Sequence, residues 1–300
     1  MATILSLKNI SKSYGRIKAL INVSFDVPDG SVFGILGPNG SGKTTLLGIV
    51  MDVLRTSGGE YSWFGNPPSE KQRREIGTLL ETPNFYHYLS GQHNLEITAA
   101  IKEKPFSDIE RVLKLVRLYE RKDSKFQTYS LGMKQRLAIA ACLLGDPAVL
   151  VFDEPTNGLD PSGIAEIRQL ITELASAGKT IILASHLLAE VEKVCTHVAI
   201  LQEGVLIKSG DVLSALSQEE WLELGSPDME KLREILNHLP GVKKITASGN
   251  IFQVYFIQAS PDAAWLNRFC FEQGIVLNYL QVRKKSLESA FIELTNNVSN

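Results

Sequence analysis

This sequence of 300 residues has few cysteines, and neither positive nor negative charge is in large excess. The three cysteines, Cys142, Cys195 and Cys270, stand far apart, which excludes a disulfide framework and paired-cysteine zinc or redox chemistry. We expect buried thiols in a reducing compartment. The 31 basic and 33 acidic residues leave a formal charge of −2, so charge gives no reason to expect a nucleic-acid partner.

Long apolar runs are also missing. A spanning helix needs about 18 to 20 consecutive apolar residues, whereas the best run, Leu137 to Leu144, is far shorter and lies beside Lys134 and Arg136. The first residues show no basic segment followed by an apolar core, so we expect no signal peptide and a cytoplasmic chain. The length and a hydrophobic content of 44% predict a folded chain of about two domains.

Three short apolar runs, Val32–Leu36, Ala148–Phe152 and Thr180–Ala184, are bounded by glycine or polar residues. Runs without alternation are typical of strands buried on both faces of a parallel sheet. Between them, apolar residues from Ile109 to Val116 recur with the helical period. Strands separated by helices predict an α/β fold.

Two other segments have antiparallel patterns. Apolar and polar residues alternate from Ile21 to Val27, and a hairpin is predicted over Val198–Ser209 with its turn at Glu203-Gly204. We therefore expect a small antiparallel sheet beside the parallel core.

The pattern restarts after about Asp211, and we place a domain boundary there, giving domains 1–212 and 213–300. The second domain is predicted to contain a strand at 221–224, a helix at 228–239, strands at 242–247 and 251–257, a helix at 261–273, a strand at 275–282 and a terminal helix at 286–294. The βαββαβ order is the ferredoxin-like arrangement of a smaller α+β domain.

A phosphate-binding loop follows the first buried run and matches the pattern G-x-x-x-x-G-K-[ST]. The residues that would hold the nucleotide here are Gly37, Pro38, Asn39, Gly40, Ser41, Gly42, Lys43, Thr44 and Thr45. Glycines let backbone N–H groups turn toward phosphate, and the helix that follows presents its positive end. Lys43 would reach the β- and γ-phosphates of ATP, and the Thr44 hydroxyl would bind Mg²⁺.

The apolar run before Asp153 and Glu154 supplies the second half of such a site. Asp153, at the carboxyl end of a strand, would hold Mg²⁺, and Glu154 could orient or deprotonate an attacking water. Taken alone, the pair could equally be solvated loop carboxylates. The phosphate loop upstream favours the catalytic interpretation.

Further motifs stand in a fixed order: Ser130–Arg136 before the second run, Asp153–Asp160 at its end, and Ser185-His186 after the third. This set resembles the ATP-binding subunit of ABC transporters over roughly Ile4 to Gly210. The resemblance implies a P-loop NTPase with a parallel-sheet core, an antiparallel β subdomain and a helical subdomain.

The resemblance also implies roles for single residues. Tyr14 is similar to the aromatic residue that stacks on adenine, although a strand-end aromatic can simply pack on the core. Ser130, Gly132 and Met133 resemble the signature motif that contacts ATP held by the opposite subunit, with Ser130 capping a helix. Asp160 resembles the D-loop aspartate, and His186 resembles the switch histidine at the γ-phosphate.

Two departures from the family pattern stand out. Glu81 takes the place of the usual Q-loop glutamine, where it would add a carboxylate to the metal site unless it is only a solvated loop residue. In the signature, Tyr129, Leu131 and Met133 replace the usual Leu, Gly and Gln. Both departures resemble exporter ATPases associated with drug efflux and with protection against bacitracin-like or lantibiotic-like peptides.

The resemblance implies an ATPase that uses ATP and Mg²⁺, pairs with a second ATPase chain as a homodimer or heterodimer, and powers a separate membrane permease from the inner face of the membrane. The aromatic loop 83–89 falls where the family's coupling surface lies, or packs within the helical subdomain. The departures and the C-terminal domain favour an exporter. The alternatives are an importer subunit, a soluble ABC ATPase and an unrelated P-loop GTPase or kinase.

Overall fold

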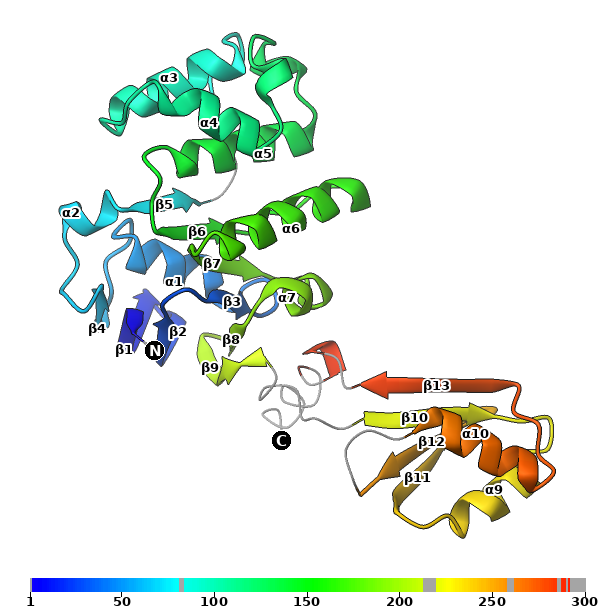
Figure 1. The fold of residues 1–300 in the computed structure, drawn as a ribbon. Helices are drawn as coiled ribbons and strands as arrows, with labels where there is room; N and C mark the ends of the chain where they lie inside the picture. Colours follow the sequence, from blue (N-terminus) through cyan, green and yellow to red (C-terminus); the bar gives the residue numbers. More distant parts are fainter. Residues whose placement is uncertain are drawn as a thin grey trace. The chain divides into compact units, whose positions relative to one another are not determined.

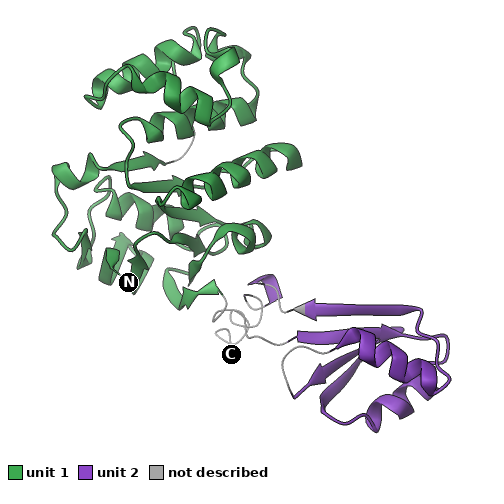
Figure 2. Cartoon of the chain, in the orientation of Figure 1, with its two compact units in different colours: residues 1–212, 294–300 green, residues 213–293 purple. Residues whose placement is uncertain are grey.

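The computed structural model describes residues 2–80, 84–212, 220–257, 262–284, 287–289 and 291. The chain divides into two compact units, one of residues 1–212 with 294–300 and one of residues 213–293 (Figure 2). Among the described residues, no helix combines the length and apolar character needed to cross a membrane. All three cysteines are free and buried, as expected.

A six-stranded sheet of order β5-β6-β7-β3-β8-β9 forms the centre of the first unit (Figure 1). Its strands are β3 (Val32–Leu36), β5 (Ile76–Leu79), β6 (Val149–Asp153), β7 (Thr180–Ser185), β8 (His197–Gln202) and β9 (Val205–Asp211). Neighbours are parallel except for the β8–β9 hairpin. The three predicted apolar runs form β3, β6 and β7, which are buried throughout.

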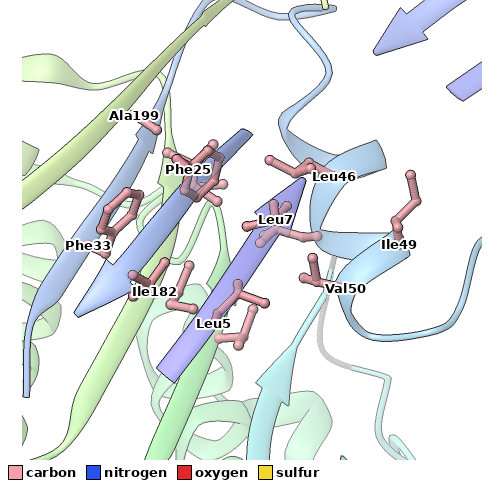
Figure 3. Close-up of a cluster of buried hydrophobic side chains, with 14 of the residues drawn as sticks. Leu5, Leu7, Phe25, Phe33, Leu46, Ile49, Val50, Ile182 and Ala199 are labelled. Atoms are coloured by element: carbon pink, nitrogen blue, oxygen red, sulfur yellow. The ribbon is translucent and has the colours of Figure 1, made fainter. Parts of the chain in front are cut away.

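An antiparallel sheet of order β2-β1-β4 lies beside this core. Its strands are β1 (Thr3–Tyr14), β2 (Ile17–Pro28) and β4 (Gly58–Trp63). Side chains of β1 and β2, including Leu5, Leu7 and Phe25, pack in one buried cluster with α1 (Lys43–Val50) and the strands of the large sheet (Figure 3). The helix that follows the phosphate loop is therefore held between the two sheets.

The remaining helices of the first unit are α2 (Glu70–Arg73), α3 (Gly91–Ile101), α4 (Asp108–Leu115), α5 (Leu131–Leu143), α6 (Pro161–Ser176) and α7 (Leu188–Val194), with 3-10 turns at Tyr119–Arg121 and Phe126–Thr128. Helices α3, α4 and α5 pack on one another as a helical subdomain (Figure 1). The predicted helix at 109–116 is α4, which buries Ile109, Val112 and Leu113. The predicted α/β class, with its antiparallel and helical subdomains, is confirmed.

The second unit is a four-stranded antiparallel sheet of order β11-β12-β10-β13. Its elements are β10 (Glu220–Gly225), α9 (Met229–Asn237), β11 (Val242–Ser248), β12 (Ile251–Phe256), α10 (Ala263–Glu272) and β13 (Tyr279–Lys284). Leu222 and Val254 of the sheet share a buried cluster with Leu232 of α9 and Leu266 of α10. This is the predicted ferredoxin-like order. Of the predicted terminal helix, residues 287–289 and 291 are helical, and the rest lies outside the described residues.

Candidate active site

The phosphate-binding loop joins the end of β3 to the start of α1. Gly42 precedes the helix with φ of 103°, and a Cβ there would come within 2.6 Å of the Ala19 carbonyl oxygen. Gly40 has φ of 82°, and nothing lies within 4 Å of where its Cβ would be. The left-handed backbone favours glycine at both positions, and at Gly42 the close approach of β2 also leaves no room for a side chain.

The β8–β9 turn braces this loop. The Gly204 N–H donates to the Ser41 carbonyl (3.1 Å), and the Gly204 carbonyl accepts from the Ile21 N–H (2.8 Å). The Ser41 hydroxyl is buried and has no hydrogen-bond partner within the described residues. A buried donor without an acceptor is costly, so this cradle fits an anion such as a phosphate.

Lys43 is buried, with 6% of its surface exposed, although it carries a charge. Its Nζ donates to the carbonyls of Gly37 (2.9 Å) and Pro38 (3.2 Å) and lies 3.4 Å from Glu154 Oε1. The ammonium group is therefore folded over the loop, held by oxygen atoms that a phosphate group could replace.

Asp153 ends β6 and is buried, and Glu154 follows it. Glu154 has a left-handed backbone with φ of 47°, and its N–H donates to the Ala184 carbonyl of the neighbouring strand β7 (3.0 Å). Its Oε2 lies 2.8 Å from His186 Nδ1. Because β6 and β7 are parallel neighbours, their carboxyl ends bring Glu154 and His186 together beside Lys43.

The residues predicted for adenine, for the signature and for the D-loop lie on other elements of the first unit, and none of them hydrogen-bonds to Lys43, Glu154 or His186 within the described residues. Tyr14 ends β1, is 45% exposed and lies under Lys12 Nζ at 5.0 Å. Ser130 caps α5 by accepting from the Met133 N–H (3.2 Å), with Gly132 in the same first turn. Asp160 caps α6 by accepting from the Gly163 N–H (3.0 Å). Glu81 lies outside the described residues.

Two of the altered signature residues, Tyr129 and Leu131, differ in how far their side chains are buried. Tyr129 is 4% exposed, and its hydroxyl donates to the Arg121 carbonyl (2.7 Å), so it anchors the loop before α5. Leu131 is 48% exposed in the first turn of that helix. Sequence reasoning identified neither the Tyr129 anchor nor the support from Gly204, because both depend on backbone groups that carry no sequence signal.

Known proteins with a similar sequence or structure identify the family to which this chain belongs. Residues 20–157 match the family described as "ABC transporter". The uncharacterized ABC transporter ATP-binding protein YhcH of Bacillus subtilis is 36% identical over 98% of this chain and 97% of its own length. The bacitracin transport ATP-binding protein BcrA of Bacillus licheniformis is 34% identical over 98% of each chain. A dimeric post-hydrolysis structure of the ATP-binding cassette MJ0796, bound to ADP and Pi, is 26% identical with a TM-score of 0.62, covering 70% of this chain and 99% of that one.

A phosphate loop beside a carboxylate–histidine pair, on a core with antiparallel and helical subdomains, defines an ATP-binding cassette. The chain belongs to the ABC transporter family, as one of its ATP-binding subunits, and is an ATPase. The resemblance seen in the sequence, including its likeness to the bacitracin-type proteins, is confirmed.

Proposed function

We propose that this ATPase powers a separate membrane permease that exports drugs, peptides or other small molecules. The cluster of Lys43, Glu154 and His186 at the phosphate loop is the observation that carries the hydrolytic half of the proposal. The transport half rests on the relatives, among them a protein named for bacitracin transport. Attachment to the inner face of the membrane would follow from the permease.

ATP binding would exchange the partners of Lys43. The β- and γ-phosphates replace the Gly37 and Pro38 carbonyls and the Glu154 carboxylate around its ammonium group. The buried Ser41 hydroxyl gains an acceptor, and the N–H groups at the start of α1 face the phosphates. The exposed ring of Tyr14 stacks on adenine.

The Mg²⁺ site would use hard oxygen donors. The Thr44 hydroxyl, in the first turn of α1, and the Asp153 carboxylate, at the end of β6, are the donor types that Mg²⁺ prefers. Glu81 is the third ligand that the sequence suggests. When bound, the ion neutralises charge on the phosphate oxygens.

Hydrolysis would use Glu154 as the base. Released from Lys43, its carboxylate takes a proton from water, and the water oxygen bonds to the γ-phosphorus as the bond to the β–γ bridging oxygen breaks, leaving ADP and phosphate. His186, already 2.8 Å from Glu154 Oε2, orients this carboxylate and contacts the γ-phosphate.

Two ATPase chains would complete each site. Ser130, Gly132 and Met133 in the first turn of α5 are not fully buried, and a helix N-terminus suits the γ-phosphate of ATP bound to an opposing chain. Asp160 would link the two sites. The dimer with ADP and Pi formed by the related cassette supports this arrangement.

The proposal is tested in the cell that carries the gene. Replacing the chromosomal copy with Glu154→Gln should raise sensitivity to bacitracin or to another member of a peptide and drug panel, as deletion does. Glu223→Gln, the same substitution in the second unit, should leave sensitivity unchanged. A deletion that alters neither sensitivity nor efflux across the panel would contradict export.

A further inference from the structure

A pocket of about 320 Å³ lies in the first unit, away from the phosphate loop. Its wall includes Ile76 at the start of β5 and Pro147 just before β6, whereas Asp153 stands at the other end of β6. A five-residue strand separates the two edges by about 15 Å. The pocket is therefore distinct from the candidate active site, and it lies where the helical subdomain meets the sheet.

Four cationic side chains line this pocket, and the two arginines are paired. Arg73 lies 2.9 Å from Asp52, and Arg74 lies 2.9 Å from Glu70. The charges of these arginines are thus balanced by carboxylates of the protein itself.

The two lysines of the pocket, Lys102 and Lys104, have no carboxylate partner within the described residues. Lys102 Nζ donates to the Ala141 carbonyl in the last turn of α5 (2.8 Å), which uses one of its three donors. The side chain of Lys104 makes no hydrogen bond or ion pair in the same described ranges, and its stem lies against Gly145. Burial lowers the pKa of Lys102, and the charge of Lys104 lowers it further.

The negative ends of helices do not account for both lysines. Helix α3 ends at Ile101 and α5 at Leu143, and their partial negative charge explains the contact of Lys102 with Ala141. The ammonium group of Lys104 remains without a counterion beside a second positive charge. Such a pair of cations in a concave site favours an anion between them.

The lining also includes Glu70, whose carboxylate is paired with Arg74. Its apolar part consists of Ile76 and Leu144, which are buried, with Ile101, Cys142 and Pro147. Burial raises the pKa of the Cys142 thiol to about 12, so this group stays neutral and adds no charge. A ligand here would meet positive charge on one side and apolar surface on the other.

We propose that this pocket binds a small amphiphilic anion, a molecule with a phosphate or carboxylate group and a short apolar chain. The acid group lies between the ammonium groups of Lys102 and Lys104, and the chain packs on Ile76 and Leu144. Because α3, α5 and β5 all contribute to the wall, an occupant would contact the helical subdomain and the sheet together.

Calorimetric titration of the full chain, with ADP saturating the phosphate loop, tests the site with n-hexyl phosphate, hexanoate and hexanol. We expect saturable binding of at least one of the two acids, whose comparison identifies the head group, and none of hexanol at the same concentrations. Lys104→Ala should weaken binding about tenfold, the effect of losing one charge-assisted contact. Lys104→Arg should retain it.

Lys71→Ala is the matched control, since Lys71 is an exposed lysine of α2 that does not line the pocket. It should bind the acid as the unaltered chain does. The proposal is overturned if neither acid binds, if hexanol binds as well as the acids, or if the Lys71 and Lys104 variants lose affinity equally. Unchanged affinity in a folded Lys104→Ala variant would also overturn it.

Discussion

Glu154 in the first unit and Glu223 in the second are both largely buried carboxylates with several polar partners. Their side chains are 19% and 13% exposed. Glu223 lies within β10 and accepts hydrogen bonds from donors on three strands, namely Trp221 Nε1 (3.5 Å), Gln253 Nε2 (3.3 Å), the Tyr279 hydroxyl (3.2 Å) and Arg283 Nε (3.1 Å). Its backbone is that of a regular strand, and both oxygens of its carboxylate accept hydrogen bonds.

Glu154 differs in both backbone and partners. It follows its strand in a left-handed conformation that non-glycine residues rarely adopt, and its carboxylate divides between Lys43 and His186. Lys43 and His186 can both contact a phosphate instead of Glu154. When they do, the carboxylate becomes available for another partner, such as water. The comparison indicates that burial alone does not mark a functional acid, and that strained backbone with exchangeable partners does.

The sharpest test of this contrast between Glu154 and Glu223 replaces each of them, in separate variants, by glutamine. Glu154→Gln should keep ATP affinity but lower the rate of hydrolysis by about 10² to 10⁴, the range for a general base, and ATP-bound dimers should accumulate. Glu223→Gln should leave the rate unchanged. Steady-state phosphate release and light scattering measure both, and equal rates in the two variants would remove Glu154 from the chemistry.

The next effect concerns the partner of Glu154. Lys43→Ala removes the ammonium group that the phosphates would contact, so ATP affinity should fall by about 10- to 100-fold. Equilibrium binding of a fluorescent ATP analogue measures this. Lys71→Ala, which removes the same charge from an exposed site on α2, is the control. Unchanged affinity in Lys43→Ala would refute the phosphate site.

A smaller effect is expected on stability at Glu223. Glu223→Gln weakens four hydrogen bonds without emptying the site, so we expect a loss of about 1 kcal/mol. Hydrogen exchange of the amides of β10 and β12 in the full chain should then accelerate about fivefold, while β3 and β6 keep their protection. Acceleration spread evenly over both units would contradict a local structural role.

The smallest expected effect is a pH dependence of this same site. Burial acts to raise the pKa of Glu223, but hydrogen bonds from Arg283, Trp221, Tyr279 and Gln253 outweigh it and lower the pKa below its ordinary 4.5. Its stabilisation is therefore complete above 4.5 and is lost as the pH falls through the folded-state value. Protection factors of β10 should fall on acidification in the unaltered chain and fall less in Glu223→Gln.

The sequence predicted those elements whose residue types are fixed by local backbone geometry or by burial. Gly40 and Gly42 are needed by backbone geometry, and the runs at β3, β6 and β7 are buried on both faces, so pattern alone located the candidate site. The roles given to Tyr14, Glu81, Ser130 and Asp160 stay predictions, because the contacts that would define them involve a nucleotide and a second chain.

Element ends were less predictable, because tertiary contacts decide them. The helix after the phosphate loop ends at Val50, although apolar residues continue to Leu54, because Asp52 turns left-handed and the Leu54 N–H bonds back to the Gly48 carbonyl. The last strand was expected from Ile275. That residue instead closes the end of α10, with its N–H bonded to the Cys270 carbonyl, and β13 begins at Tyr279.

The position of β3 in its sheet has a consequence for how the protein is made. This strand, which carries the phosphate loop, pairs with β7 and β8, and the Gly204 turn then braces Ser41. All three supports lie more than 140 residues further along the chain. A ribosome must therefore complete most of the first unit before the loop can close, so a shorter nascent chain has no formed phosphate loop with which to bind ATP.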